Sequence, residues 1–232
     1  MDKDILNECV SFYGNLYSSK VVNAETDCFV TQPNVKCLNN SDKLLCEGIL
    51  NRKECLDALK RMKGDKSPGT DGLPREFYKV FWNDLVEILL NSLNYSYDIG
   101  KLSTSQRRGI TKLIPKKDAE LNLIKNWRPL TVLNCDYKIA TKAIASCMKA
   151  VIPTLISDDQ TGFIKGRFIG DNIRLIDSFI KYTAEREICR DYFSSSILRK
   201  PLIQLNGLLY KKTLLHFGFG SSLLNWIKVF LL

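Results

Sequence analysis

Two short stretches of this sequence carry a β-strand pattern, and most of its other regular patterning is helical. Residues 108–115 (RGITKLIP) include the β-branched Ile110 and Ile114 and end in a proline. Residues 128–134 (RPLTVLN) form a second short apolar run. We expect the two runs to pair as an antiparallel hairpin joined by a long, mobile tip. The predicted fold class is therefore α+β, with one short hairpin in a helix-rich chain.

The helical segments follow from the spacing of apolar residues. No apolar run reaches the roughly 18 residues that a membrane span needs, so we expect no membrane partner. The composition, 45% hydrophobic and 25% charged, is that of an ordinary globular protein. Residues 20–48 and 64–74 are predicted loops. Helices are predicted over residues 1–20, 51–63, 75–98, 136–150, 168–186 and 208–232, the last broken at 217–220.

The charge of the chain is strongly positive. The net charge is +9 over 232 residues, and the excess lies after residue 60 because residues 1–60 are net negative. Such an imbalance favours a polyanionic partner, usually nucleic acid. The alternative is a basic surface that binds nothing.

Cysteine and histidine usage argues against a metal site or a nucleophilic enzyme. The eight Cys include no C-x-x-C pair, and the lone His216 lies far from any Cys in the sequence. The first residues lack the basic and apolar start of a secretory signal. We therefore expect reduced thiols, and a nuclear or cytoplasmic location rather than secretion.

A turn dense in Gly and Pro, residues 64–74 (GDKSPGTDGLP), invites comparison with a phosphate-binding loop. A Walker loop needs Gly, four residues and then Gly-Lys-Ser/Thr, whereas Gly69 is followed by Thr70 and Asp71. Nucleotide hydrolysis is therefore disfavoured. The alternative is a connection between helices whose glycines supply positive φ.

Basic residues stand at three predicted turns. Lys116 follows the first strand, Arg128 begins the second, and Lys165 and Arg167 flank Gly166. A hairpin tip with Lys and Arg can clamp a triphosphate, because Arg offers a planar fork and Lys a point charge. The alternative is that these are solvated loop charges.

Four motifs stand out in the sequence. They are KSPGTDGLPREFYKVFW (66–82), ITKLIPKK with NWRPLTVLNCDYKIATKAIA (110–117 and 126–145), QTGFIKGRFIGDNI (160–173) and FGFGSSLLNWIKVF (217–230). These motifs resemble the fingers and the start of the palm of LINE-type, non-LTR retrotransposon reverse transcriptases. Their order and spacing match that family from about residue 50 to residue 232.

The resemblance implies a right-hand polymerase that binds an RNA template and a DNA primer and that, in the intact family, uses Mg²⁺. By position, Lys116 and Arg128 resemble the residues that grip the incoming nucleotide. Two loops resemble those that hold the template and primer backbone. Their residues are Lys66, Gly69, Asp71 and Gly72 in the first loop, and Gln160, Gly162, Lys165, Gly166 and Arg167 in the second.

The catalytic carboxylates of that family are not found where the resemblance puts them. Counting back from Phe217 places the first metal-binding Asp at Ile197, and Ile cannot ligate a metal. Asp191 comes six positions too early, and no paired-Asp motif occurs before Leu232. We therefore assign no catalytic residue, no metal ligand and no cofactor to this chain.

A shift of reading frame explains the departure. With suitable codons, residues 201–207 (PLIQLNG) read one base earlier encode AFDSVEW, the pattern of the missing motif. We expect residues 193–207 to be the catalytic strand translated out of frame. Arg199 and Lys200 there are too costly to bury in a central strand. The folded part should then end near residue 190, and the helices after residue 208 should dock poorly.

The predicted organisation has three parts. Residues 1–50 form an N-terminal helix and polar linker, 51–190 the fingers and start of the palm, and 191–232 a disrupted palm remnant. The predicted function is that of a retrotransposon RNA-directed DNA polymerase fragment, ancestrally making DNA by template-primed synthesis and inactive in this chain. The alternatives are a non-catalytic nucleic-acid-binding module and an inert protein-interaction remnant.

Overall fold

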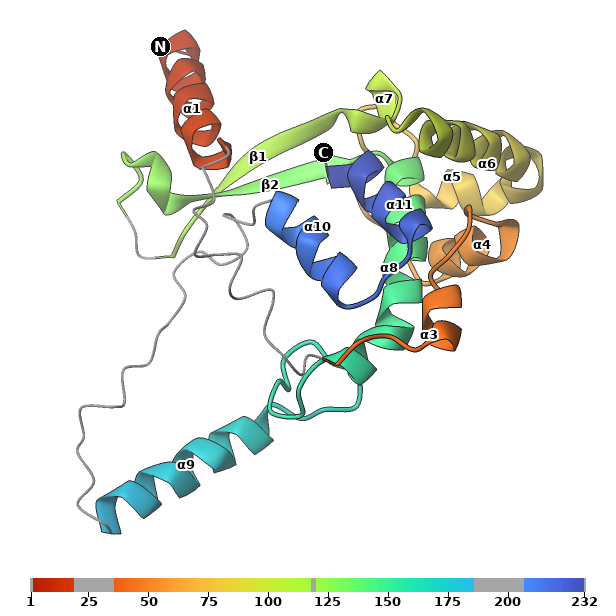
Figure 1. Cartoon of the computed structure of the whole chain (residues 1–232). Coiled ribbons are helices and arrows are strands. Elements are labelled where there is room, and N and C mark those ends of the chain that lie inside the picture. The colour runs from red at the N-terminus through yellow and green to blue at the C-terminus, as the bar shows by residue number, and fades with distance from the viewer. Residues whose placement is uncertain (1, 19–35, 118–119, 186–206, 232) are drawn as a thin grey trace.

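A computed structural model of the chain describes residues 2–18, 36–117, 120–185 and 207–231 (Figure 1). Most of these residues form helices around one core, and a long hairpin and two helices, α1 and α9, lie outside it. In chain order the elements are α1 (Asp2–Tyr17), α3 (Asn40–Leu44), α4 (Arg52–Lys60), α5 (Arg75–Val80), α6 (Trp82–Ile99), α7 (Thr104–Arg107), β1 (Gly109–Pro115), η1 (Ile124–Asn126), β2 (Trp127–Leu133), α8 (Cys135–Leu155), α9 (Gly170–Glu185), α10 (Gly207–His216) and α11 (Ser221–Leu231).

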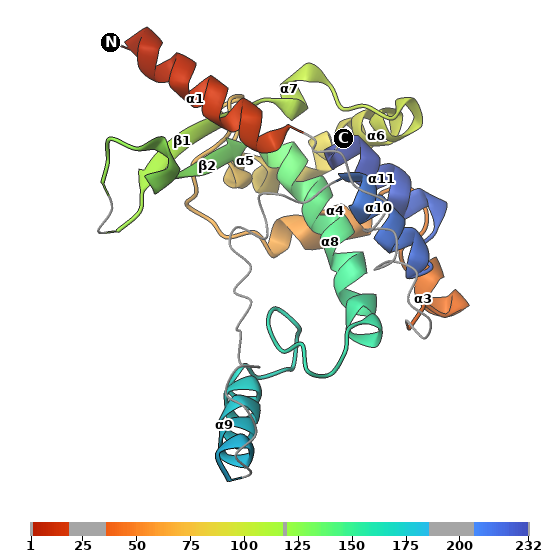
Figure 2. The same ribbon diagram turned by 60° about the vertical axis from the view of Figure 1, so that its left-hand side comes forward.

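The centre of the core is the packing of α4 against α8, which cross each other in Figure 2. Small side chains at Ala58, Ala140 and Ala143 are fully or almost fully buried here, which lets the two helices approach closely. Helix α6 adds Val86 and Leu93, both with no exposed surface. The predicted helices therefore meet through the faces that their apolar spacing defines.

The predicted hairpin is confirmed. Strands β1 and β2 pair antiparallel in a two-stranded sheet, with Gly109 opposite Leu133 and Thr111 opposite Thr131. The two Thr hydroxyls lie 2.9 Å apart across the strands. Strand β1 is largely exposed and β2 is partly exposed, with no fully buried residue in either, so the hairpin stands out from the body rather than forming its core (Figure 1).

Two predicted helical boundaries differ in the structure. The single helix expected over residues 75–98 is divided into α5 and α6 at Phe81, whose φ of −97° and ψ of 25° leave the helical region. Residues 40–44, expected to be loop, form the short helix α3. There the Asn39 side chain accepts a hydrogen bond from the Asp42 amide at 2.7 Å. Capping fixes this turn, and apolar spacing gives no sign of it.

The expectation that the helices after residue 208 dock poorly is wrong. Leu214 of α10 and Trp226 of α11 are buried in the same core as α4, α6 and α8. The Trp226 Nε1 donates to the Gly48 carbonyl at 3.1 Å, and the Asn225 Nδ2 donates to the Tyr97 carbonyl at 2.9 Å. The apolar face of α11 therefore packs on the core, although residues 193–207 before it are predicted to be frame-shifted. The break expected at 217–220 does separate α10 from α11.

Helix α9 takes no part in this packing. It extends away from the body in both views (Figures 1 and 2). The side chains of Ile173, Ile176 and Ile180 in α9, and of Ile169 just before it, are 48–65% exposed. The period of these residues predicted an amphipathic helix over 168–186, and that helix is present. Its apolar face, however, stays largely exposed rather than joining the core.

No helix in the described part of the chain is long and apolar enough to cross a membrane. The stretch 193–207, for which a frame-shifted strand is predicted, lies outside the described residues apart from residue 207 at the start of α10.

Candidate nucleic-acid interface

The β1–β2 hairpin brings the two predicted nucleotide-binding residues to one end of the molecule. Arg128 lies opposite Ile114 in the strand register, and the Lys116 amide extends the ladder by donating to the Asn126 carbonyl at 2.9 Å. Arg128 is exposed. The Lys116 side chain is half-buried, and its Nζ donates to the Lys125 carbonyl at 2.7 Å. Both cations therefore lie where the strands meet the tip.

Side-chain alternation places further basic and apolar groups beside them. Successive side chains of a strand point to opposite faces, so Lys112 and Ile114 share one face with Arg128 on the neighbouring strand. Ile114 is 43% exposed and Leu130, opposite Lys112, is 51% exposed. This face therefore offers cations for phosphates and uncovered apolar surface for sugars or bases.

The described part of the tip is held in place by its own side chains. Trp127 donates from Nε1 to the Leu121 carbonyl at 2.9 Å, and Asn126 donates from Nδ2 to the Glu120 carbonyl at 2.8 Å. These bonds fold residues 120–126 back on the end of β2. The basic end of the hairpin is consequently part of a hydrogen-bonded structure.

The predicted template loop at residues 64–74 is fastened to the start of α8 by Asn134. A Cβ atom on Gly69 would come within 2.6 Å of the Asn134 backbone nitrogen, so only glycine fits there. The buried Asn134 Oδ1 accepts from the Thr70 amide at 2.8 Å and from the Thr70 hydroxyl at 3.1 Å. Its Nδ2 donates to the Ser105 carbonyl at 3.1 Å. One side chain thus joins the loop, α7 and α8.

The other residues of this loop divide into a turn and an exposed charge. Gly72 has a φ of +74° and its amide donates to the Gly69 carbonyl, so the glycine supplies the positive φ expected of a helix connection. The Asp71 Oδ1 accepts from the Leu73 amide at 3.0 Å. Lys66 is exposed. Of the predicted backbone-binding residues here, Lys66 is the one whose side chain faces solvent.

A neighbouring carboxyl has an altered acidity. Burial raises the pKa of the Asp136 carboxyl at the start of α8, and the Asp71 carboxylate nearby raises this pKa further. Hydrogen bonds oppose this shift, including one from the Tyr137 amide at 2.7 Å. Sequence patterns do not reveal this pair, because 65 residues separate the two carboxyls.

In the second predicted loop, Arg167 binds protein backbone. Its Nη1 donates to the carbonyls of Ser157 and Gln160, the latter at 2.7 Å. Its Nη2 donates to the Ile156 carbonyl at 3.1 Å and pairs with the Asp158 carboxylate at 3.2 Å. These carbonyls follow the end of α8, where a cation is favourable. Arg167 therefore closes the loop against α8 through its fork of donors.

The remaining residues of that loop are more open. Gln160, Lys165 and Gly166 are exposed, and Gly166 has a φ of +84°. Gly162 is half-buried. Phe163 also has a positive φ, of +63°, and its side chain is fully exposed. The structure places this loop at the far end of α8 from the hairpin (Figure 1), so the two predicted loops are not brought together.

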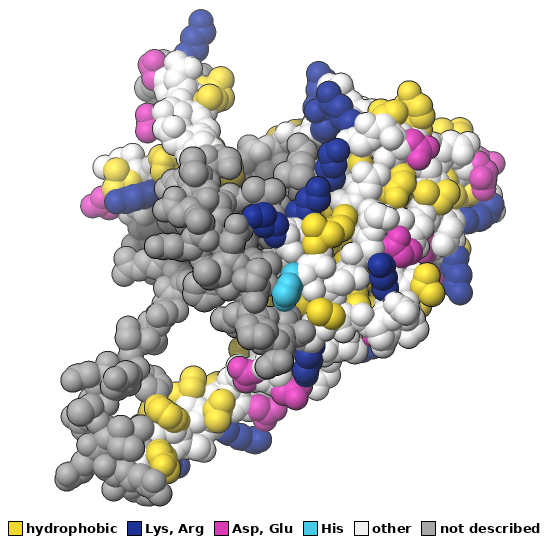
Figure 3. All heavy atoms as spheres, in the orientation of Figure 1, with side chains coloured by type: hydrophobic (Ala, Val, Ile, Leu, Met, Phe, Trp, Pro, Cys, Tyr) yellow, Lys and Arg dark blue, Asp and Glu magenta, His cyan; other side chains and the backbone are white. Residues whose placement is uncertain are grey.

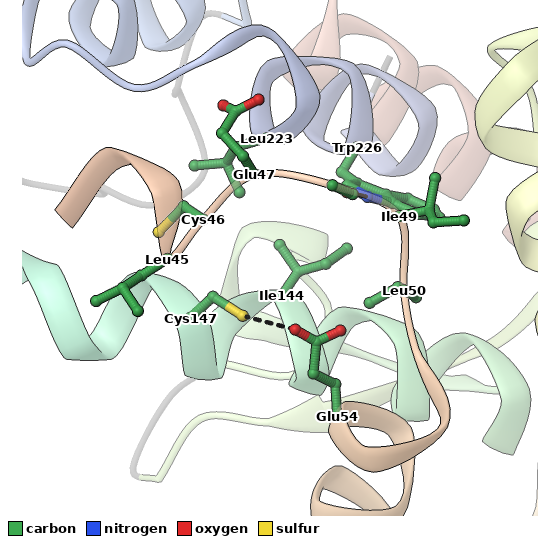
Figure 4. A pocket seen from close by; sticks show the side chains of 11 residues that line it. Leu45, Cys46, Glu47, Ile49, Leu50, Glu54, Ile144, Cys147, Leu223 and Trp226 are labelled. Atoms are coloured by element: carbon green, nitrogen blue, oxygen red, sulfur yellow. Dashed lines mark hydrogen bonds between the residues drawn. The ribbon is translucent and has the colours of Figure 1, made fainter. Parts of the chain in front are cut away.

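A small hollow lies between the 45–50 segment, α8 and α11 (Figure 4). The Cys147 thiol points toward Glu54 and donates to its Oε1 at 3.9 Å. Burial raises the pKa of the Cys46 thiol to about 11. A thiol of that acidity stays protonated at neutral pH and is a poor nucleophile. The hollow accordingly resembles a packing defect of the core more than a reaction site.

Metal ligands are not assembled in the described part of the chain. There, no group of three or more His, Cys, Asp or Glu side chains is arranged to hold a metal ion. Ile197, at the position where the resemblance puts a metal-binding Asp, lies outside the described residues.

Surface charge follows the positive net charge of the sequence. On the face drawn in Figure 3, Lys and Arg side chains gather in a row between α7 and α10, and Asp and Glu side chains lie apart from this row. A row of one sign suits an extended polyanion.

Two comparisons with known proteins bear on this surface. Residues 114–201 match the family model of the reverse transcriptase (RNA-dependent DNA polymerase). This match covers β2, α8, the loop at 160–167 and α9. Over 218 residues, 94% of this chain, the sequence is 34% identical to the transposon TX1 uncharacterized 149 kDa protein of Xenopus laevis. The chain spans 16% of the length of that protein.

Together the two matches support a fragment of a retrotransposon reverse transcriptase. This agrees with the resemblance carried by the four sequence motifs, and the helix-rich structure with its two-stranded antiparallel sheet is consistent with an α+β fragment of such an enzyme.

Proposed function

We propose that this chain corresponds to the fingers and the start of the palm of a LINE-type, non-LTR reverse transcriptase, and that it binds nucleic acid without synthesising DNA. One observation carries the binding part: the hairpin holds Lys116 and Arg128 at one exposed, hydrogen-bonded end. Nucleic-acid partners also follow from the family match over residues 114–201. An RNA template and a DNA primer are the partners that we expect.

The lack of synthesis rests on the sequence. In-line phosphoryl transfer needs carboxylates that converge on a pair of divalent ions, and Ile197 occupies the expected Asp position. In a primer-extension assay with Mg²⁺ or Mn²⁺, we expect no incorporation of dNTP above a blank. A chelator-sensitive product from the purified chain would overturn the proposal of inactivity.

Binding is tested with the hairpin variant Lys116→Ala/Arg128→Ala. We expect the variant to bind a labelled RNA–DNA hybrid more weakly and with a smaller salt dependence, the slope falling by about 0.9 for each phosphate that is no longer neutralised. Lys79→Ala/Lys101→Ala, which removes two exposed cations from α5 and the α6–α7 connection, is the matched control. Equal affinity and slope in wild type and hairpin variant would contradict the assignment of Lys116 and Arg128.

Arg167 stays a predicted backbone-binding residue, but it is unsuited to this test. Its guanidinium already donates to carbonyls around the end of α8. An Arg167 variant would therefore alter binding and folding together. Lys165, exposed in the same loop, is the better probe of that loop: Lys165→Ala removes an exposed charge and leaves the hydrogen bonds of Arg167 in place.

A second candidate function is supported by α9. Its apolar side chains between Ile173 and Tyr182 are each 46–65% exposed, and exposed apolar faces mark protein contacts or aggregation. In the interaction-remnant alternative, the chain associates through α9 and has no nucleic-acid affinity. Light scattering at several protein concentrations, with and without Ile173→Asp/Ile176→Asp, separates the two candidates.

A further inference from the structure

The outer side of α8 carries a row of lysines to which neither the family match nor the four motifs give a role. We call Lys138, Lys142 and Lys149 the lysine stripe. At 3.6 residues per turn, residues four and eleven positions apart lie within about 40° of each other around the helix axis. The rise of the helix spaces the first two lysines by about 6 Å and the last two by about 10 Å.

The stripe lies opposite the face that α8 buries. The core side of the helix presents Ile139, Ala143 and Val151, each at most 1% exposed. Lys149 is exposed, and Lys138 and Lys142 are half-buried. The exposed Ala145 lies between Lys142 and Lys149, and its small side chain does not separate the two lysines. Because α8 rests on α4 with its other side (Figure 2), the stripe faces away from the α4 contact.

These three cations lack acidic partners in the described structure. The ion pairs between described residues include those of Arg52, Arg75, Arg167, Arg174 and Lys181, and none of these pairs uses a lysine of the stripe. The sequence of α8 contains a single acidic residue, Asp136. That carboxyl lies on the side of the Asp71 loop, since it interacts with Gln106 and Asp71. Like charges one turn apart repel, so an isolated helix gains nothing from the stripe.

We propose that the lysine stripe is a binding track for the sugar–phosphate backbone of one nucleic-acid strand. Its length of about 16 Å matches about five consecutive phosphates, which follow each other every 3.4 Å or so along the axis of a duplex. Lysines act as point charges on phosphates and make no base contacts there. The track therefore binds irrespective of base sequence.

The track also has a place relative to the hairpin. β2 ends at Leu133, and Asn134 leads directly into α8, so Lys138 begins one turn after the hairpin joins the helix. Asn134 is pinned to Thr70 and Ser105, which fixes the direction of α8 at this junction. A strand held at the hairpin can thus continue along α8. This inference rests on the proposed nucleic-acid function and adds a second contact surface to it.

The test uses the full chain and the variant Lys138→Gln/Lys142→Gln/Lys149→Gln. A labelled 20-nucleotide oligo-dT is titrated at several salt concentrations, and oligo-dA serves as a second probe. We expect the slope of log affinity against log salt to fall by about 2, because each contact to a single strand contributes about 0.7. The reduction should be equal for the two probes.

The control removes three exposed lysines elsewhere, Lys60→Gln/Lys63→Gln/Lys79→Gln, and so matches the change in net charge. Thermal melting by circular dichroism checks that both triple variants are folded. An unchanged slope in the stripe variant, or an equal reduction in the control, would overturn the track. If the hairpin variant weakens binding and the stripe variant does not, the proposed function stands and the track fails. No binding by wild type would overturn both.

Discussion

Gly69 shows at the scale of one residue how a glycine of the predicted template loop meets a folding requirement. Its Cα–H side lies against Asn134, and a methyl group there would come within 2.6 Å of backbone atoms of that residue. Gly72, three residues later, has open space around the missing Cβ but a φ of +74°. The two glycines therefore serve different physical needs within one turn.

We predict that Gly69→Ala costs about 3 kcal/mol of unfolding free energy, because the clash with backbone cannot be relieved by a rotamer change. Gly72→Ala should cost about 1 kcal/mol, the strain of a left-handed alanine. Urea unfolding of both variants measures the difference. Equal costs would mean that Gly69 does not contact Asn134 as described.

Asp136 supplies a test by pH. Its pKa is raised above the ordinary 3.8 by burial, so the folded state holds the proton more tightly than the unfolded state. The stabilisation that follows is complete below pH 3.8 and is lost as the pH rises through the folded pKa. In Asp136→Asn this dependence should vanish.

The measurement is the unfolding free energy of wild type and Asp136→Asn between about pH 3.5 and 6.5. Wild type should become less stable relative to the variant as the pH increases. Parallel curves over this range would show that the carboxyl is not buried as the structure places it. The counterpart variant Asp177→Asn changes an exposed carboxylate of α9 and should leave the curve shape unchanged.

At the scale of secondary-structure elements, α8 depends on a residue outside the helix. The Arg167 side chain is 18% exposed and donates to the Pro153 carbonyl in the last turn of α8 and to the Ile156 carbonyl that follows it. Helix ends leave such carbonyls without partners, and Pro153 within the last turn removes one backbone donor. Arg167 thus compensates for an end that the helix cannot satisfy itself.

Arg167→Ala should therefore cost about 2–3 kcal/mol, in the range for hydrogen bonds from a charged group. Arg167→Lys should restore less than half of this, because an ammonium cannot reach several carbonyls with one planar fork. Arg174→Ala, which removes an exposed ion pair on α9, is the control and should change stability by less than about 0.5 kcal/mol. Full rescue by lysine would show that charge alone is needed.

Elements with long apolar periodicity were the predictable ones. The hairpin and the helices over 51–63, 136–150 and 168–186 appear close to their expected bounds, because the spacing of their apolar side chains sets the pattern. The short helices α3 and α7 were missed since each depends on a cap rather than a face. In α7, for example, Ser103 and Gln106 cap each other. The break between α5 and α6 at Phe81 was also missed, because the apolar spacing continues across it.

Long-range contacts explain what the sequence could not predict about the candidate site. The Asn134 hub joins residues more than 60 positions apart, and local pattern carries no such information. Arg167 was expected to hold the template or primer backbone because its loop resembles that of the family, and the carbonyls that it contacts lie at and after the end of α8. The proximity of Lys116 and Arg128 was easier to predict, because the pairing of the two strands brings these residues together at the tip of the hairpin.

At the scale of the whole molecule, the described chain closes its core with its last helices. The 45–50 segment, α6 and α11 meet at Trp226, which is 2% exposed and whose ring centroid lies 4.7 Å from that of Tyr97. The Glu47 carboxylate accepts from the Ser222 amide at the start of α11, a favourable place for an anion. Segments far apart in the sequence therefore stabilise one unit.

We predict on this basis that Trp226→Ala lowers the unfolding free energy by about 4 kcal/mol, since it removes a buried indole and its hydrogen bond to Gly48. Leu215→Ala on α10 is the control, because that side chain is 52% exposed, and it should cost less than about 1 kcal/mol. Urea unfolding followed by far-ultraviolet circular dichroism measures both.

A single transition that moves to lower urea with its slope unchanged is expected if α11 belongs to the cooperative core. If Trp226→Ala shifts the midpoint no more than Leu215→Ala does, then α11 is a loosely attached helix, and the expectation of a fold that ends near residue 190 would be restored.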